Sequence, residues 1–269
     1  MFTYIDMTHK VAILIPTTSK NRDSWKTMKD TYLYKTIKSF LQSVSTNDAN
    51  QYTFFLGYDI DDRIFSIEKQ QAILNKFQKV FKQITITWIS LSGIEKGHLT
   101  KMWNRLFRNA FNVGNDYFYQ CGDDIDFCTK GWVESTIQML QIHNNIGISG
   151  PINNNNRILT QAMVSRKHME IFGFFFPESI INWCCDDWYN WVYQPNYFYP
   201  IKEHFCANIG GQPRYIINNN RNFNTSDLSL IKNTRLLRES TYALAKEHSK
   251  IIKDYVDKQI NDSDSQCVI

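Results

Sequence analysis

The sequence predicts an α/β fold in which a mostly parallel sheet is covered by helices on both faces. Short apolar runs alternate with segments whose apolar residues recur every three or four positions, and this alternation continues through the first half of the chain. It is typical of parallel strands joined by crossover helices. Ligands of such sheets bind beyond the carboxyl ends of the strands. We therefore expect the binding site among the residues that follow the strands.

The elements of the first half follow from these patterns. The apolar run 11–15, stopped by Pro16, predicts a buried parallel strand. Helical spacing from Ser24 to Val44 predicts the first helix. A second strand is expected over 52–58, a helix over 67–81, a third strand over 84–90 and a helix over 98–111. Polar residues follow the first two strands, with Pro16, Thr17 and Thr18 after one and Asp59 after the other.

The most informative stretch begins at Asn115, where an apolar run predicts a buried strand that ends in three carboxylates. In an extended backbone, Asp124 and Asp126 project to one side and Asp123 to the other. Mg²⁺ and Mn²⁺ are often held by one or two carboxylates together with the phosphates of a substrate. The pattern therefore indicates a metal site for a nucleotide diphosphate compound. The alternative is a solvated turn that caps the next helix, since Asp favours such positions.

The second half of the sequence is less regular. A short strand is expected over 162–165, a helix over 166–173, and polar loops at 153–156 and 218–222. Apolar residues spaced from Leu228 to Val256 predict a charged helical tail that packs on the body or on a second subunit. We expect a catalytic domain over 1–215 and a loop with a C-terminal helical extension over 216–269.

Composition narrows the class of protein. The formal net charge of +4 is spread along 269 residues, which argues against nucleic acid as a partner. The six cysteines lack metal or disulfide spacing, so they indicate free thiols in a reducing compartment. No apolar run has the length of a transmembrane helix, and a soluble cytoplasmic protein is expected. Enrichment in Asn, Ile, Lys, Tyr and Phe is typical of an AT-rich coding genome, such as that of a virus or a protist.

Five short motifs in order resemble the family 2 glycosyltransferases of the GT-A fold, over residues 10–214. They are Ile15-Pro16-Thr17; Lys96-Gly97 with Asn104; Gly122-Asp123-Asp124-Ile125-Asp126 with Gly131-Trp132; Ala162-Met163-Val164 with Gly173-Phe174; and Asp186-Asp187-Trp188. The resemblance implies a Rossmann-like sheet and a nucleotide-sugar site. The tail after 214 has no counterpart in it.

The resemblance also implies roles for individual residues. Asp124 and Asp126 would bind Mn²⁺ or Mg²⁺ and the diphosphate, with His204 or Asn208 as a further metal ligand. Pro16, Thr17, Thr18, Asp59, Lys96 and Asp123 would surround the nucleotide, although Lys96 is equally compatible with a solvated surface position. Asp187 would be the catalytic base, but Asp186 stands where the family has Glu, so either carboxylate could serve. Trp183 and Trp188 would flank the acceptor, with core packing as the alternative.

The function expected from this resemblance is metal-dependent, inverting transfer of a single sugar, with UDP-sugars favoured, to an acceptor hydroxyl. The Gln-x-x-Arg-Trp signature of processive synthases is absent from the sequence. One alternative is a sugar nucleotidyltransferase, which opens with a glycine-rich phosphate loop, whereas 16–22 contains no glycine. The other is a carbohydrate- or nucleotide-binding module without turnover. A homodimer formed through the C-terminal helix is a further expectation.

Overall fold

A computed structural model describes residues 8–45, 48–155, 157–210 and 228–266, and the side chains of the C-terminal helix from 234 to 262. One eight-stranded sheet has the order β3-β2-β1-β4-β7-β6-β8-β5. Its strands are β1 (Lys10–Thr17), β2 (Gln51–Tyr58), β3 (Ile84–Ser90), β4 (Tyr117–Gln120), β5 (Ile125–Phe127), β6 (Ile148–Ile152), β7 (Ala162–Ser165) and β8 (Phe198–Asn208). The parallel sheet predicted for the first half is confirmed, because β1 pairs in parallel with β2 and β4, and β2 pairs in parallel with β3.

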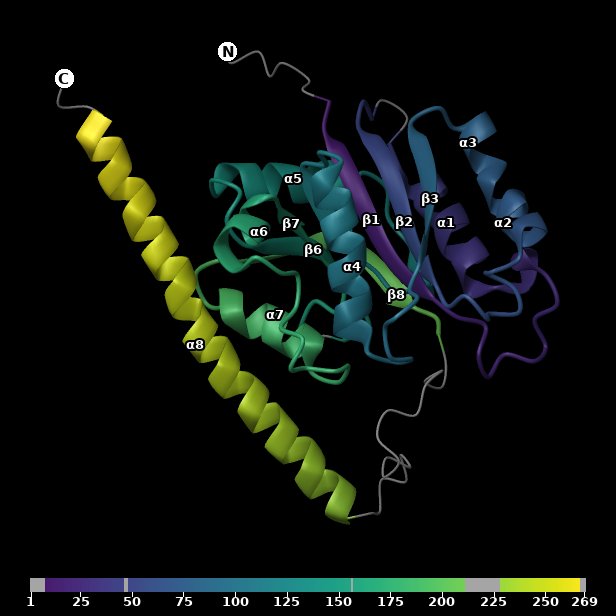
Figure 1. Ribbon diagram of the computed structural model, residues 1–269. Helices are drawn as coiled ribbons and strands as arrows, with labels where there is room; N and C mark the ends of the chain where they lie inside the picture. The colour runs from purple at the N-terminus through teal and green to yellow at the C-terminus, as the bar shows by residue number, and fades with distance from the viewer. Residues whose placement is uncertain (1–7, 46–47, 156, 211–227, 267–269) are drawn as a thin grey trace.

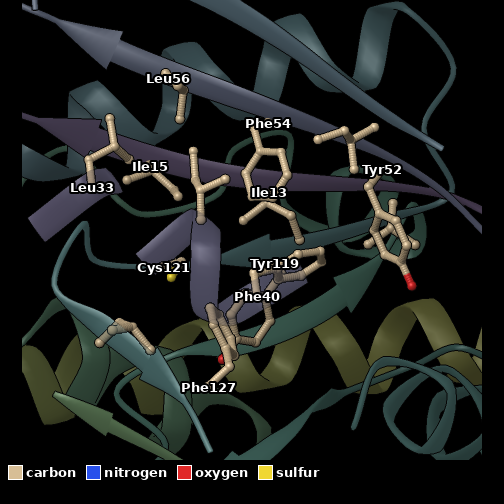
Figure 2. Close-up of a cluster of buried hydrophobic side chains, with 14 of the residues drawn as sticks. Ile13, Ile15, Leu33, Phe40, Tyr52, Phe54, Leu56, Tyr119, Cys121 and Phe127 are labelled. Atoms are coloured by element: carbon tan, nitrogen blue, oxygen red, sulfur yellow. The ribbon is translucent and has the colours of Figure 1, made fainter. Parts of the chain in front are cut away.

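Both faces of β1 are buried, which explains its unbroken apolar run. Val11, Ile13 and Ile15 pack in a cluster with α1 (Tyr32–Ser43), whereas Ala12 and Leu14 pack with α4 (Leu99–Asn112) on the opposite face. Figure 2 shows the first cluster, in which Phe40 of α1 lies among side chains of the sheet. The Phe40 ring meets Phe54 edge to face, with centroids 5.1 Å apart.

The first two predicted helices are interrupted. The segment expected as a helix from residue 24 contains a 3₁₀ turn, Met28–Asp30, and α1 begins only after Thr31, whose side chain accepts from the Tyr34 amide. The Thr31 backbone is extended at this cap, so the turn before it is separated from the helix. The segment expected over 67–81 divides into α2 (Glu68–Asn75) and α3 (Phe77–Val80).

The second half adds strands that the sequence did not predict. The predicted strand β7 is present, but it runs antiparallel to β4 and joins the unpredicted β6. Asp126 lies in β5, which pairs antiparallel with the end of β8 through Asp126 and Ala207. The helices of this half are α5 (Trp132–Ile142), α6 (Lys167–Phe172), α7 (Cys185–Tyr193) and α8 (Leu228–Gln266). The predicted loop at 218–222 lies outside the described residues.

The long helix α8 confirms the predicted helical tail, and it packs beside α7 (Figure 1). The indole Nε1 of Trp188 donates to His248 Nδ1 at 3.3 Å, and the hydroxyl of Tyr255 donates to Glu170 of α6 at 2.7 Å. The Trp191 ring also meets Tyr242 edge to face. Within the described ranges, no helix has both the length and the apolarity to cross a bilayer.

Candidate active site

A cavity of about 300 Å³ lies beyond the carboxyl ends of β1 and β4, within the usual size range of small-molecule sites. Pro16 lines it from β1, and Gln120, Asp123 and Asp124 line it from the end of β4 and the following turn. The start of α7 contributes 184–186, and the end of β8 contributes Asn208. Two of the predicted acidic motifs therefore meet at one cavity, although 62 residues separate Asp124 from Asp186 (186 − 124).

Asp123 fixes the turn at the base of the cavity. Its side chain is fully buried, and one carboxylate oxygen accepts from Thr17 Oγ1 at 2.6 Å. The Asp123 carbonyl accepts from Thr36 Oγ1 at 2.9 Å, and the same hydroxyl accepts from the Ile125 amide at 3.0 Å. The predicted nucleotide residues Thr17 and Asp123 are thus hydrogen-bonded to each other and join the ends of β1 and β4.

The Asp124 carboxylate lies in a space that only glycines leave open. A Cβ on Gly122 would stand 2.6 Å from Asp124 Oδ1, and one on Gly210 would stand 1.9 Å from Oδ2. Both distances are far below van der Waals contact. The backbone of this turn is also tied to the end of β8, because the Ile209 amide donates to the Asp124 carbonyl at 2.9 Å.

The acidic residues fit a divalent cation only in part. Asp124 lines the cavity, whereas Asp126, two residues further along β5, does not. No group of three or more His, Cys, Asp or Glu that could hold a metal occurs in the part of the chain that the structure describes. One or two carboxylates nevertheless suffice for Mg²⁺ or Mn²⁺ when substrate phosphates complete the coordination.

His204 is engaged elsewhere. Its Nε2 lies 2.9 Å from Ser135 Oγ, and its Nδ1 lies 3.1 Å from Thr129 Oγ1. Both ring nitrogens therefore have hydroxyl partners, which argues against the expected metal role. Asn208, the alternative, does line the cavity, and its Oδ1 accepts from the Gly210 amide at 2.9 Å.

The loops after β1 and β2 are held together by Asp62, which the sequence analysis did not single out. Its buried carboxylate accepts from Thr18 Oγ1 at 3.0 Å and from the amide and hydroxyl of Ser19 at 2.6 and 2.9 Å. It also accepts from the amides of Ile64 and Phe65, each at 2.9 Å. Thr18 follows β1, where the sequence predicted nucleotide contacts. Its hydroxyl donates to Asp62, a carboxylate that holds the two loops together.

Four of the predicted nucleotide residues lie outside the cavity lining, namely Thr17, Thr18, Asp59 and Lys96. Asp59 is buried at the end of β2. Lys96 is half-exposed and forms an ion pair with Asp61, whose carboxylate raises the lysine pKa. Lys96 therefore occupies the surface position that the sequence left open as its alternative.

Adjacent carboxylates at the start of α7 have different surroundings. Asp186 lines the cavity, and burial, followed by the neighbouring charge of Asp187, raises its pKa to about 6. Asp187 is buried, does not line the cavity and forms an ion pair with Arg157. Arg238 of α8 approaches the same Asp187 oxygen at 3.9 Å.

Cys184, directly before α7, has φ = 70°, a strained conformation of the kind that clusters at functional sites.

Of the two tryptophans predicted to contact the acceptor, one lines the cavity and the other is buried in the core. Trp183 is 37% exposed and lines the cavity. Trp188 is 0% exposed and packs in the core against α8. Its burial leaves no surface for an acceptor, so the core alternative applies to Trp188.

Several residues that the sequence analysis did not propose also line the cavity, among them Trp103, Gln120 and Gln161. Each is at most 5% exposed. The signal for Gln120 was present in the sequence, because an amide ends an otherwise apolar and aromatic strand. Trp103 sits within a helical pattern and is indistinguishable there from a core residue.

Comparison with known proteins identifies the fold. No family model and no curated protein matches the chain. Among solved structures, the mannosyltransferase PcManGT from Pyrobaculum calidifontis, in complex with GDP-Man and Mn²⁺, matches with a TM-score of 0.53 and 9% identity, over 77% of this chain and 58% of that one. The chain thus spans little more than half the length of PcManGT.

Residues 1–349 of S. aureus TarS match comparably. The UDP complex gives a TM-score of 0.53 with 9% identity, over 89% of this chain and 69% of that one. The UDP-GlcNAc complex gives 0.52 with 10% identity, over 89% and 72%. The predicted GT-A fold is therefore confirmed.

Proposed function

We propose that the protein is a glycosyltransferase that moves a single sugar from a nucleotide-diphosphate sugar to an acceptor hydroxyl. The observation that carries this proposal is that Asp124 and Asp186 line one cavity at the carboxyl ends of the parallel strands. A transfer reaction needs a group that holds the diphosphate and a group that takes the acceptor proton. The shared GT-A fold supports the same reaction class.

In this proposal Asp186 is the general base. Its carboxylate accepts the proton of the acceptor hydroxyl while the acceptor oxygen bonds to the anomeric carbon. The bond from that carbon to the diphosphate oxygen breaks, and the nucleoside diphosphate leaves with the electron pair. This single displacement inverts the anomeric configuration. A pKa of about 6 leaves Asp186 ionised at neutral pH yet basic enough to take a proton.

Asp187 takes a positioning role in this scheme. Its ion pair with Arg157 joins the start of α7 to the segment after β6, and its charge contributes to the raised pKa of Asp186. The alternative keeps Asp187 as the base, as the family resemblance implies. That alternative requires the ion pair to open when the acceptor binds.

Asp124 would hold Mn²⁺ or Mg²⁺ together with the donor diphosphate, whereas Asp126, its predicted partner, does not line the cavity. A bound cation would neutralise the charge that develops on the departing diphosphate. The glycine-lined space around Asp124 supports this role, because it keeps the carboxylate beside the cavity. The matched structures hold UDP, UDP-GlcNAc or GDP-Man, and UDP-sugars remain the favoured donors.

Trp183, exposed at the cavity lining, is the proposed acceptor contact, because an aromatic face can pack on a sugar ring.

Dimerisation through α8 remains a prediction. Sedimentation of the purified protein would test it.

The proposal is tested by thermal unfolding of the protein with UDP-, GDP-, dTDP- and CMP-sugars, each with and without Mn²⁺, followed by an acceptor screen with the stabilising donor. Ligand binding raises the apparent unfolding temperature by mass action. We expect stabilisation by one nucleotide class that depends on the metal. A folded protein that no nucleotide sugar stabilises would contradict the proposal. Stabilisation without transfer to any acceptor or to water would favour a binding module.

A further inference from the structure

Gln120 is a buried amide at the cavity wall with an unused hydrogen-bonding atom. It ends β4, is 3% exposed and lines the cavity. Its Oε1 is fully buried and has no hydrogen-bond partner among the described residues. The strand partners of Gln120 are Leu14 in β1 and Ala162 in β7, and neither side chain can donate to it.

An unpaired buried amide is unfavourable in the free protein. Leaving such a group desolvated and unsatisfied destabilises the folded protein, whereas an apolar side chain of the same shape carries no such cost. Buried polar groups without partners are uncommon and call for an explanation. A ligand that donates to Oε1 would remove the cost on binding.

Two of the other amide side chains that line the cavity, Gln161 and Asn208, already have partners in the protein. Gln161 Oε1 accepts from Thr160 Oγ1 at 2.9 Å and from Cys206 Sγ at 3.8 Å. Asn208 Oδ1 accepts from the Gly210 amide. These contacts account for both amide oxygens. Gln120 therefore differs from them in having capacity left for a ligand.

We propose that Gln120 binds a hydroxyl of the transferred sugar and contributes to the choice of donor, an inference that rests on the proposed function. A hydroxyl both donates and accepts, so it satisfies the Gln120 amide in either orientation, whereas an ionised diphosphate only accepts. The transferred sugar must lie between the diphosphate held at Asp124 and the base at Asp186. Gln120 lines the same cavity as both carboxylates.

The test is Gln120→Met, which keeps the length of the side chain and removes the amide. Calorimetric titrations with Mn²⁺ would compare UDP with UDP-GlcNAc and GDP with GDP-mannose. For the pair that wild type binds, we expect about tenfold weaker binding of the nucleotide sugar, the loss typical of one hydrogen bond, and unchanged binding of the nucleotide. The unfolding temperature of the free variant should be equal or higher, because an unpaired buried amide is gone.

Gln161→Met is the matched control, since it removes an amide oxygen that already has protein partners. We expect a lower unfolding temperature for this variant, because Thr160 and Cys206 lose their acceptor. Donors that lack single hydroxyls then locate the contact. The donor without the relevant hydroxyl should bind wild type and Gln120→Met equally.

Three results would overturn this inference without overturning the proposed function. If Gln120→Met weakens nucleotide and nucleotide sugar equally, or lowers the unfolding temperature, the residue is structural. If binding of the nucleotide sugar is unchanged, water satisfies the amide. Failure of the proposed function is distinguishable, because no nucleotide sugar of the thermal unfolding screen would then stabilise wild type.

Discussion

Asp186 and Asp187 are consecutive residues in the first turn of α7, but only Asp186 lines the cavity, whereas the buried Asp187 forms an ion pair with the half-exposed Arg157. This arrangement predicts different phenotypes for the two variants. Asp186→Asn should lower kcat by about 10²- to 10⁴-fold, the usual contribution of a general base, with donor binding retained. Steady-state kinetics and donor titration would check both parts.

Asp187→Asn should instead shift the pH dependence of transfer. The Asp187 charge raises the Asp186 pKa, and the Arg157 charge lowers it. Removing the Asp187 charge therefore lowers the Asp186 pKa and moves the acid limb of the kcat profile below pH 6. Arg157→Gln should move the same limb to higher pH. If Asp187→Asn abolishes transfer and Asp186→Asn leaves it intact, Asp187 is the base.

Gly210→Ala should displace the Asp124 carboxylate while leaving residue 124 itself unchanged. The added Cβ would stand 1.9 Å from Asp124 Oδ2, so the carboxylate must move. We expect the variant to lose the Mn²⁺-dependent part of donor binding, as Asp124→Asn should, and calorimetry at several Mn²⁺ concentrations measures this. Ile209→Ala is the neighbouring control, since it keeps the amide that donates to the Asp124 carbonyl. Wild-type Mn²⁺ dependence in Gly210→Ala would show that Asp124 does not act through the metal.

Asp62→Ala should destabilise the protein strongly. Five donors from the loops after β1 and β2 converge on this buried carboxylate. Hydrogen bonds to charged groups contribute about 1.5–3 kcal/mol each, so the loss should exceed about 3 kcal/mol in the free energy of unfolding, measured by urea denaturation. Asp61→Asn is the matched control because its ion pair with Lys96 is exposed, and such pairs contribute little. Equal stabilities of the two variants would contradict this assignment.

The parallel half of the sheet could be predicted from sequence because β1, β2 and β4 are largely buried and rich in apolar and aromatic residues, while the edge strand β3 alternates apolar residues with threonine. The strands β6 and β8 were not predicted. β6 contains Gly150 and Pro151, and β8 has a mixed pattern of burial with a register shift opposite Ile152. Residues of this kind resemble loops until a partner strand is known.

Within the site, the two acidic motifs could be predicted from the order of short motifs along the sequence, because the residue types of a short motif indicate its chemistry without tertiary information. It could not separate Asp186 from Asp187, since the distinction arises from Arg157, 30 residues away (187 − 157), and from the approach of α8. It also could not distinguish Asp59 from Asp62. Only the folded loops show that Asp62 receives the hydrogen bonds of Thr18 and Ser19.

His168 should make stability depend on pH. Its ring is buried, with Nδ1 2.7 Å from the Tyr193 hydroxyl and Nε2 3.0 Å from the Phe175 carbonyl, and burial lowers its pKa to about 4. Between pH 4 and 6.5 the unfolded state therefore binds more protons, so stability rises with pH and is lost as pH falls through this window. The shift corresponds to a loss on the order of 3 kcal/mol at pH 4.

Asp186 acts in the opposite sense, because its raised pKa makes the folded state bind more protons between pH 4 and 6. The His168 contribution must therefore be taken as the difference between wild type and His168→Gln, measured by urea denaturation at pH 4.5, 5.5 and 7. The variant should be less stable at pH 7, because both hydrogen bonds change, and the gap should narrow as pH falls, since only wild type must keep an imidazole neutral. A gap that is constant with pH would mean that His168 titrates normally in the folded protein.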